Sequence, residues 1–262
     1  MGKKNKQPKI DIIIPNYNKG MYLSASINSV INQTYKNWKL YIIDDNSHDD
    51  SKRILKRYKK KAKINIFFLK NNKGPGFCRN LGISKSKSQY VAFLDSDDYW
   101  PKNKLNSQIK YMLKNNLDFT YTDYISFFQN KRGIRKLGKS NVPSNFTFSS
   151  FIKNTSINTS TLLLSQKLIK NIRFKDLKRH EDYIFKCEIL KNNKNLIAKK
   201  FNKSHAYYRI LEKSRSQNKL KSIFYLWKYN KKFNKLNFLD NVFSIIFISF
   251  HSLRKYGLTK GV

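Results

Sequence analysis

The chain has 262 residues, with 54 Lys and Arg against 16 Asp and Glu, which gives a formal net charge of +38. This length fits one large α/β domain with an appendage, and no run reaches the roughly 18 apolar residues that a membrane-spanning helix needs. The charge favours a nucleic-acid or anionic-membrane partner, although Lys, Asn and Ile are abundant throughout, so an AT-rich genome explains it equally well.

Residues 1–9 form a basic N-terminal tail without the apolar core and cleavage site of a signal peptide. Four short runs follow in which β-branched and aromatic residues end at polar or turn residues, and each predicts a strand: 10–14, 39–43, 64–69 and 90–94. Between the first two, Leu23, Ile27 and Val30 recur at helical spacing, and 51–63 predicts the next helix. Because strands and helices alternate, this half, 10–100, predicts a parallel, nucleotide-binding sheet.

The pattern changes after residue 100. A helix is predicted over 102–115, followed by strands over 118–122 and 160–164 and a helix from near Glu181. We expect this half, 101–219, to hold an acceptor and to complete a catalytic domain spanning 10–219. Residues 220–262 interleave basic and aromatic residues, which predicts a C-terminal amphipathic helical region.

The cysteines, Cys78 and Cys187, lie far apart in apolar helical contexts. Neither has the spacing of a metal site or of a disulfide framework. We therefore expect both thiols to be free and buried, in a reducing cytoplasm.

Polar residues follow four of the predicted elements, at the places where ligands of α/β sheets bind. The four segments are Pro15-Asn16-Tyr17-Asn18, Asp44-Asp45-Asn46-Ser47, Gly74 to Asn80, and Asp95-Ser96-Asp97-Asp98. An aromatic ring can pack on a nucleoside, carboxylates can accept hydrogen bonds from a base or ribose, and a guanidinium suits phosphate. Carboxylates at i and i+2 can hold a divalent cation that offsets the charge of a leaving pyrophosphate. Singly, adjacent aspartates more often form turns, but the four segments together indicate a nucleotide site.

These segments resemble the signature series of family 2 glycosyltransferases. The matching residues are Ile12 to Asn18, Gln33-Thr34-Tyr35, Asp44 to Ser47, Arg79 to Ile83 and Phe93 to Asp98, and the similarity covers about 9–215. The resemblance implies a GT-A fold, which is a Rossmann-like, nucleotide-binding mixed sheet flanked by helices. It also implies hexosyl transfer from a nucleotide-sugar, with UDP expected, assisted by Mn²⁺ or Mg²⁺ and with inversion at the anomeric carbon.

The same resemblance implies roles for particular residues. Pro15, Asn16, Tyr17 and Asp45 would bind the nucleoside part of the donor, and Arg79 would approach its phosphates. Asp95-Ser96-Asp97 would be the metal motif, with Asp97 as the direct ligand and Asp95 beside it.

Inversion requires a base on the face opposite the leaving group. Glu181-Asp182 is similar to the family's acidic pair, whose second member is the base, so Asp182 is the candidate. The alternative is an acid that only favours the helix dipole. Arg209 lies in a segment similar to the one that closes over the donor phosphates, and its alternative is structural stacking on aromatic rings. We assign His180 no role.

The apolar run 238–250 is too short to span a bilayer, but its basic flanks fit a helical hairpin in an anionic headgroup layer. Packing on the catalytic domain or on a second subunit is the alternative, so a dimer stays open. The tail resembles those of bacterial enzymes that build capsule, teichuronic-acid or lipopolysaccharide glycans on lipid-linked acceptors. We therefore expect a cytoplasmic protein, peripheral to the inner face of the membrane.

Two other functions compete with this one. A nucleic-acid-binding protein should carry a recognition module, and none is evident, so we expect no nucleic-acid partner. A sugar-nucleotide pyrophosphorylase should carry a glycine-rich, lysine-containing loop near its first strand. Residues 16–20, Asn-Tyr-Asn-Lys-Gly, do not form such a loop.

Overall fold

The computed structural model describes residues 7–130, 133–211 and 219–257. Within these ranges nine strands form one sheet, in the order β3-β2-β1-β4-β8-β5-β9-β7, with β6 paired to β5. The strands are β1 (Ile10–Asn16), β2 (Trp38–Asp44), β3 (Ile64–Phe68), β4 (Tyr90–Phe93), β5 (Phe119–Asn130), β6 (Gly133–Lys139), β7 (Asn145–Phe146), β8 (Leu163–Ser165) and β9 (Ala198–Arg209).

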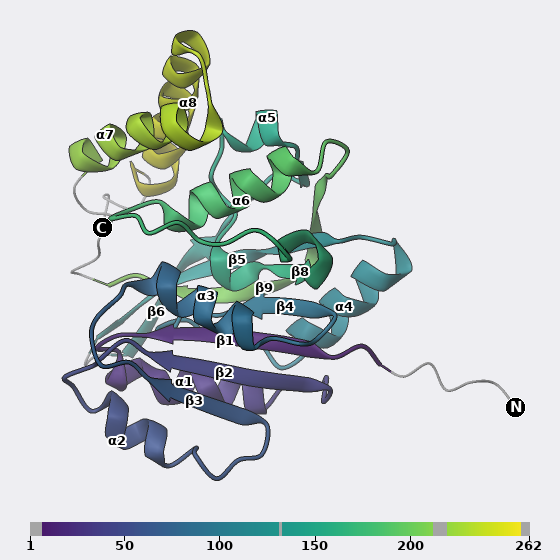
Figure 1. Ribbon diagram of the computed structural model, residues 1–262, viewed down its shortest axis with the longest axis vertical. Helices are drawn as coiled ribbons and strands as arrows, with labels where there is room; N and C mark the ends of the chain where they lie inside the picture. The colour runs from purple at the N-terminus through teal and green to yellow at the C-terminus, as the bar shows by residue number, and fades with distance from the viewer. Residues whose placement is uncertain (1–6, 131–132, 212–218, 258–262) are drawn as a thin grey trace, which may run out of the picture.

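Helices pack on both faces of this sheet (Figure 1). They are α1 (Gly20–Ile31), α2 (Ser51–Lys56), α3 (Pro75–Lys85), α4 (Lys104–Lys114), α5 (Phe148–Phe151), α6 (Glu181–Asn192), α7 (Lys219–Tyr229) and α8 (Phe238–Gly257). Two short 3-10 turns, η1 (Thr159–Thr161) and η2 (Gln166–Ile169), flank β8, and a π-helical turn, η3 (Asn230–Asn234), joins α7 to α8.

The first half of the chain forms the parallel part of the sheet. β1 pairs in parallel with β2 and β4, and β2 pairs in parallel with β3, so the four predicted strands are confirmed. Every residue of β1 is buried, which explains why its sequence is a nearly continuous apolar run rather than an alternating one. Because β1, β2, β3 and β4 run parallel, their carboxyl ends lie at one edge of the sheet.

The second half makes the sheet mixed, as predicted. β8 runs antiparallel to both β4 and β5, whereas β9 runs parallel to β5. The strand predicted over 160–164 begins only at Leu163, because the Asn158 side chain accepts a hydrogen bond from the Ser160 N–H and stabilises turn η1 instead. The helix predicted over 51–63 ends at Lys56. A longer helix would place the like charges of Lys56 and Lys60 one turn apart, which is unfavourable.

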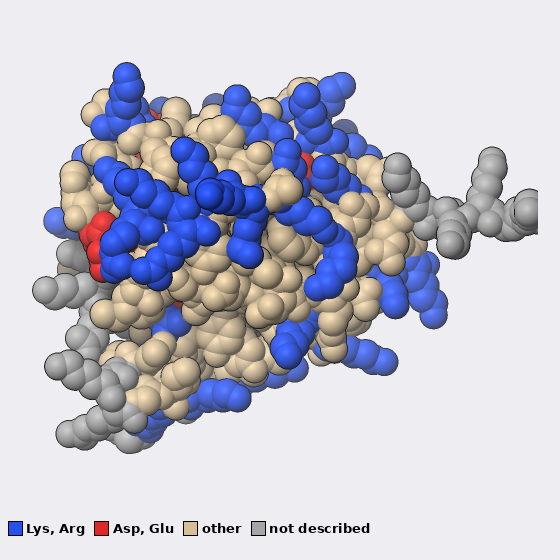
Figure 2. Space-filling model, turned by 90° about the horizontal axis from the view of Figure 1, so that it is seen from below, with Lys and Arg blue, Asp and Glu red and all other residues tan. Residues whose placement is uncertain are grey.

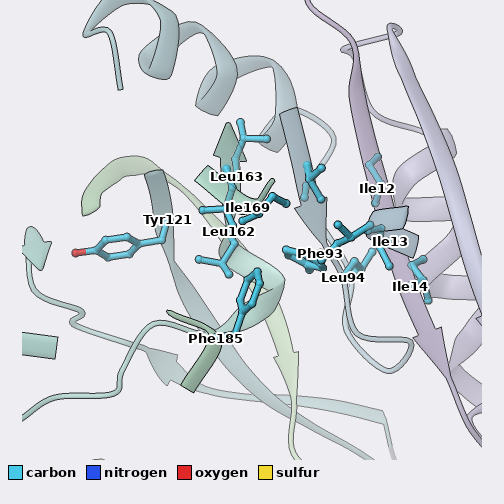
Figure 3. Packing of buried hydrophobic residues seen from close by; sticks show 14 of the residues in the cluster. Ile12, Ile13, Ile14, Phe93, Leu94, Tyr121, Leu162, Leu163, Ile169 and Phe185 are labelled. Carbon is cyan, nitrogen blue, oxygen red and sulfur yellow. The ribbon is translucent and has the colours of Figure 1, made fainter. Parts of the chain in front are cut away.

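The core is continuous from β1 through β4 and β8 to helix α6 (Figure 3). Helix α3 lies against β1, and this contact requires glycine at position 82. A Cβ atom there would lie 2.5 Å from Cγ2 of Ile13, well inside van der Waals contact. The close approach seats α3 directly over the strand whose end carries the first polar segment.

The C-terminal helices α7 and α8 form a hairpin that stands beside α6, at the end of the molecule's long axis opposite α2 (Figure 1). A buried polar network joins hairpin and α6. The Tyr183 hydroxyl donates to Oδ1 of Asn230 at 2.8 Å, and Nδ2 of Asn230 donates to Oγ of Ser244 at 3.0 Å. The hairpin is thus fixed to the helix that begins with Glu181-Asp182.

Both cysteines are free and buried, as predicted. None of the described helices is long and apolar enough to cross a membrane. Lys and Arg crowd the face at the α2 end, where acidic side chains are few (Figure 2). Such a surface attracts anionic ligands in general.

Candidate active site

The ends of β1 and β2 are fixed by a buried hydrogen-bond cluster. Asn16 lies opposite Asp44 in the strand register, and its Nδ2 donates to Oδ1 of Asp44 at 2.7 Å. Ser47 donates to the same carboxylate oxygen at 2.7 Å. Oδ1 of Asn16 is buried and has no hydrogen-bond partner in the described part of the chain. Asn16 therefore holds the strand ends together rather than reaching outward.

Asp45 ties the end of β2 to the turn that opens α3. Its two carboxylate oxygens accept the backbone N–H groups of Lys73 and Gly74, at 2.7 and 2.8 Å. Gly74 has a φ of 84°, a left-handed conformation that favours glycine. Pro15 is buried within β1, whereas Tyr17 is 43% exposed at the strand end. Of these predicted nucleoside-binding residues, Tyr17 is the one whose ring is open to a ligand.

The acidic motif that follows β4 is anchored through Asp98. Its carboxylate accepts the Ser160 hydroxyl at 2.6 Å and the Arg209 backbone N–H at 3.0 Å. Burial, together with the charges of Asp97 and Asp95, raises the pKa of Asp98 well above its ordinary value. Asp98 is therefore a structural member of the motif.

Arg209 fixes the same motif from β9. Its Nε donates to the backbone oxygen of Asp97 at 2.9 Å. The guanidinium stacks on the rings of Tyr22 and Phe127, at 4.3 and 4.5 Å from their centroids. The stacking that we considered as an alternative is thus present, and it coexists with a contact to the predicted metal motif.

The side chain of Asp97 contacts Lys19, which lies in the loop after β1. The two side chains form an ion pair, with 3.0 Å between Nζ and Oδ2. Burial and the neighbouring Asp95 raise the pKa of Asp97, and Lys19 opposes them. Ser96, between the two carboxylates, is buried. Among the described residues no group of three or more His, Cys, Asp and Glu side chains could hold a metal by itself.

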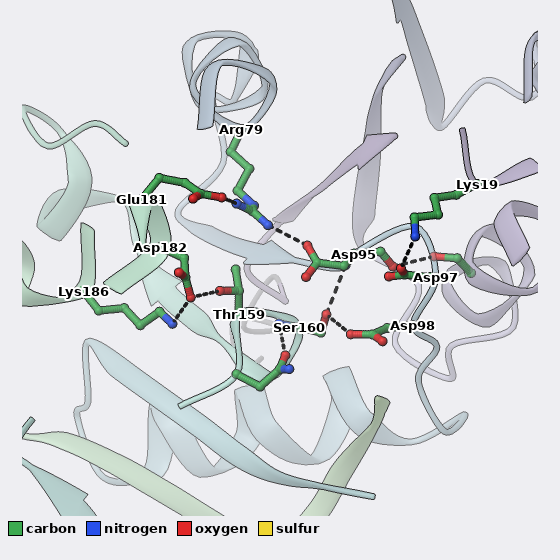
Figure 4. Close-up of polar contacts among 12 residues, drawn as sticks. Lys19, Arg79, Asp95, Asp97, Asp98, Thr159, Ser160, Glu181, Asp182 and Lys186 are labelled. Atoms are coloured by element: carbon green, nitrogen blue, oxygen red, sulfur yellow. Dashed lines mark hydrogen bonds and ion pairs between the residues drawn. The ribbon is translucent and has the colours of Figure 1, made fainter. Parts of the chain in front are cut away.

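Arg79 joins this motif to the start of helix α6. Its Nη2 lies 2.7 Å from Oδ1 of Asp95, and its Nη1 lies 3.4 Å from Oε1 of Glu181 (Figure 4). The buried guanidinium also packs on the ring of Phe174, 5.2 Å from its centroid. Burial disfavours its charge, but Asp95 and Glu181 outweigh that effect and raise the pKa of Arg79. Two acidic segments that are distant in sequence, one with Asp95 and one with Glu181, therefore lie around one cation.

Asp182 follows Glu181 at the first turn of α6. Its Oδ2 accepts hydrogen bonds from Nζ of Lys186 at 2.7 Å and from Oγ1 of Thr159 at 3.2 Å. Burial alone would raise the pKa of Asp182, but Lys186, with smaller contributions from Arg79 and His180, holds it below its usual range. The carboxyl is therefore ionised at neutral pH.

Sequence reasoning missed several residues of this site. Lys186 could have been found, because it lies four residues after Asp182 on a predicted helix and so on the same face. Thr159 and Ser160 carry no such signal, since their contacts come from a turn distant in sequence. His180 is the left-handed residue before α6, with a φ of 59°, and its Nε2 lies 2.9 Å from Oγ of Ser222 on α7.

The fold and the site together define an α/β protein with a parallel half and an acidic site at its strand ends. Residues 11–173 match the family described as glycosyl transferase family 2. The chain therefore belongs to this family and is a glycosyltransferase, as the signature segments predicted.

Relatives match most of the chain. It is 29% identical to a putative teichuronic acid biosynthesis glycosyltransferase, TuaG, from Bacillus subtilis, over 96% of this chain and 98% of that one. It is 35% identical to UDP-Glc:alpha-D-GlcNAc-diphosphoundecaprenol beta-1,3-glucosyltransferase WfgD from Escherichia coli, over 83% of each chain.

Solved structures bear out the GT-A fold. TarS from S. aureus, in complex with UDP-GlcNAc, has a TM-score of 0.69 at 21% identity, covering 89% of this chain and 69% of that one. A mannosyltransferase from Pyrobaculum calidifontis, in complex with GDP-Man and Mn²⁺, has a TM-score of 0.65 at 12% identity, covering 89% and 66%. The nucleic-acid-binding and pyrophosphorylase alternatives gain no support from these comparisons.

Proposed function

We propose that this glycosyltransferase moves a sugar from a UDP-sugar to a lipid-linked bacterial surface glycan, with inversion at the anomeric carbon and Asp182 as general base. The observation that carries this proposal is the Arg79 bridge, because it joins the Asp95 motif to the helix turn that presents Asp182. The donor and acceptor classes are supported by the UDP-Glc donor and the diphosphoundecaprenol-linked acceptor in the name of the E. coli relative.

The donor would lie across the strand ends. The exposed ring of Tyr17 would stack on the base, with Pro15 and Asn16 shaping the strand end beneath it. Asp45 would contribute its remaining lone pairs, since each of its oxygens accepts one hydrogen bond from the α3 turn. Arg79 and Arg209 are the cations that would face the phosphates.

The carboxylates of the Asp95-Ser96-Asp97 motif suit a hard cation. Mg²⁺ and similar ions bind through one or two carboxylates together with substrate phosphates. The Asp97 carboxylate already pairs with one cation, the Lys19 ammonium. A bound Mn²⁺ or Mg²⁺ would offset the charge that builds on the leaving diphosphate. Ser96 and Asp98 would keep the two ligands in place from within the buried turn.

Asp182 would act on the acceptor. As the acceptor oxygen forms its bond to the anomeric carbon, a carboxylate oxygen takes the hydroxyl proton, and the bond to the diphosphate breaks with its electron pair leaving on UDP. The low pKa of Asp182 keeps it ionised and ready to accept that proton. Glu181 is held by Arg79 and has no separate role in this step.

A pair of matched variants tests this assignment. Asp182→Asn should keep the affinity for UDP, measured by calorimetry with Mn²⁺, yet lose at least about a hundredfold in transfer. Asp176→Asn makes the same chemical change at an exposed position six residues earlier and should transfer normally. The transfer assays would use UDP-, GDP- and dTDP-sugars as donors, tested in parallel. Turnover retained by Asp182→Asn would dismiss Asp182 as the base.

We also propose that the α7–α8 hairpin docks on the inner face of the cytoplasmic membrane. Helix α8 has the reverse of the pattern expected for a helix in water: its buried side chains include Asn241 and Ser244, whereas its exposed side chains, apart from Asp240, are apolar. The exposed apolar side chains are Phe238, Leu239, Phe243, Ile246, Phe247 and Phe250. An outer face of this kind fits an apolar environment.

Charge favours the membrane as that environment. Exposed lysines follow one another at the end of α7 and in the turn before α8, at Lys228, Lys231, Lys232 and Lys235. Each basic residue near an anionic headgroup layer contributes about 1 kcal/mol. A lipid-linked acceptor would then meet an enzyme whose hairpin is fixed to α6 through Tyr183 and Asn230.

A further inference from the structure

Helix α6 carries a buried lysine one turn after Asp182. The side chain of Lys186 is 1% exposed, whereas that of Asp182 is 38% exposed. Nζ of Lys186 donates to Oδ2 of Asp182 at 2.7 Å and to the backbone oxygen of Ile157 at 2.8 Å. A lysine is almost never fully buried unless it is paired. The ammonium is therefore fixed between one carbonyl and one carboxylate oxygen.

Thr159 reaches the same carboxylate oxygen from turn η1. Its hydroxyl donates to Oδ2 of Asp182 at 3.2 Å. The turn is itself held by Asn158, whose Oδ1 accepts the Ser160 N–H at 2.7 Å. Figure 4 shows both bonds meeting at one oxygen of Asp182, and no donor in the described part of the chain bonds to the other oxygen, Oδ1. The carboxylate is asymmetric: one oxygen is occupied and one is available.

We propose that Lys186 is a positioning residue for sugar transfer, which together with Thr159 immobilises Oδ2 of Asp182 and presents Oδ1 to the acceptor hydroxyl. This inference rests on the proposed role of Asp182 as the base. In the step itself, Oδ1 takes the hydroxyl proton as the new glycosidic bond forms, and the electron pair of the broken bond leaves on the diphosphate. Lys186 keeps its own proton throughout.

The charges around Asp182 make Lys186 the dominant influence on it. Partial burial favours the neutral acid and so raises the pKa of Asp182. Lys186 lowers this pKa by its charge and by its hydrogen bond, and the charges of Arg79 on α3 and His180 before α6 lower it further. Glu181 precedes Asp182, but its carboxylate faces Arg79. Without the Lys186 ammonium, only the weaker contributions of Arg79 and His180 would oppose burial, so the pKa of Asp182 would rise.

A purely structural role would predict something different. If Lys186 only tied α6 to the backbone at Ile157, its loss would lower stability without changing the ionisation of Asp182. Lys186→Met keeps the unbranched apolar part of the side chain and removes the ammonium, and Lys186→Arg keeps the charge. The two variants therefore separate packing from charge.

The test is a titration followed by ¹³C NMR of Asp-labelled protein, in which Asp182→Asn identifies the Asp182 carboxyl signal. In Lys186→Met we expect this carboxyl to titrate at least about one pH unit higher than in the wild type. Lys186→Arg should titrate close to the wild type. An unchanged titration in Lys186→Met, with the fold intact by circular dichroism, would overturn the proposal.

Should Lys186→Met fail to fold, Thr159→Val gives the second route. It removes one of the two donors to Oδ2, so the Asp182 carboxyl should titrate at higher pH than in the wild type, and no shift would again contradict the proposal.

Turnover separates this inference from the proposed function. With UDP-glucose and a synthetic lipid-diphospho-N-acetylglucosamine acceptor as probes, Lys186→Met should lose about tenfold to a hundredfold in kcat while KM for the donor stays unchanged. The acidic limb of its pH profile should move to higher pH in parallel with the titration. If Asp182→Asn transfers normally, the base assignment fails. If Asp182→Asn is inactive and Lys186→Met titrates like the wild type, only the positioning role fails.

Discussion

The guanidinium of Arg79 lies 2.7 Å from the carboxylate of Asp95, and its second amino group lies 3.4 Å from that of Glu181. One buried cation thus connects the motif after β4 with the first turn of α6. The arrangement accounts for the position of Asp182, because the turn that carries it is fixed against the Asp95-Ser96-Asp97 segment rather than by local sequence alone.

Replacing Arg79 should therefore destabilise the protein. Arg79→Met leaves the carboxylates of Asp95 and Glu181 without their shared partner, and breaking a buried ion pair in this way costs about 3–5 kcal/mol. The free energy of unfolding from urea titration measures this. Arg53→Met is the matched control, because the Arg53–Asp50 pair is exposed and its loss should leave the urea midpoint unchanged. Equal midpoints for both variants would refute the bridge.

Asp97 should govern metal dependence. In Asp97→Ala, we expect Mn²⁺ to increase UDP affinity roughly tenfold less than in the wild type, because one of the two carboxylate ligands is gone. Calorimetry with and without Mn²⁺ measures the difference. Asp118→Ala removes an acid that pairs with Lys167 elsewhere and should behave like the wild type. The same Mn²⁺ dependence in Asp97→Ala would exclude Asp97 as a ligand.

The thiols should be inert in the folded protein. Burial raises the pKa of Cys187 to about 12 and that of Cys78 even further, and both side chains are fully covered. At pH 8 only about one Cys187 in ten thousand would be a thiolate, and reactivity should rise as the pH approaches 12. Ellman's reagent should detect no thiol in native protein and two after denaturation. Rapid labelling at pH 8 would contradict this burial.

The hairpin should bind anionic vesicles through the apolar face of α8. The triple variant Phe243→Ser, Phe247→Ser, Phe250→Ser should lose at least about tenfold in affinity for phosphatidylglycerol vesicles, since each exposed ring contributes of the order of 1 kcal/mol or more when buried. Cosedimentation at several salt concentrations measures it, and binding by the wild type should weaken as salt rises.

The control for that experiment changes exposed apolar residues outside the hairpin. The triple variant Phe68→Ser, Leu113→Ser, Ile134→Ser removes side chains of similar exposure and should bind vesicles normally. The alternative is that a second copy of the chain covers this face. That result would be no vesicle binding by the wild type, together with a concentration-dependent dimer in analytical ultracentrifugation that the α8 variant does not form.

The parallel half of the fold could be predicted because its signals are local. Each of its strands is a short apolar run that ends at a polar turn, and β1 is buried along its whole length. Strand β6 gives no such signal: most of its residues are exposed, so no alternation appears. Strand β9 was missed because it contains many polar residues and lacks a local apolar pattern. It is a strand because its backbone pairs with β5, a segment distant in sequence. The proposed division near residue 100 stays a prediction, since one sheet includes strands from both halves.

Asp95, Asp97 and Asp182 were singled out because an acidic residue type coincides there with a strand end or a helix start, and their roles stay predictions. What could not be predicted is which of these groups hold one another. Asp45 and Asp98 have their oxygens engaged by backbone N–H groups and a serine hydroxyl, and only the folded chain reveals these partners. The role of Asp45 in binding the donor remains a prediction.

If the donor and the base occupy one site, a crystal structure with UDP and Mn²⁺ will show them together. We expect the diphosphate beside the Asp97 carboxylate, with the Asp182 carboxylate facing the open side of the same site. Nucleotide density away from Asp97, or an Asp182 side chain with the protein interior between it and the diphosphate, would contradict it.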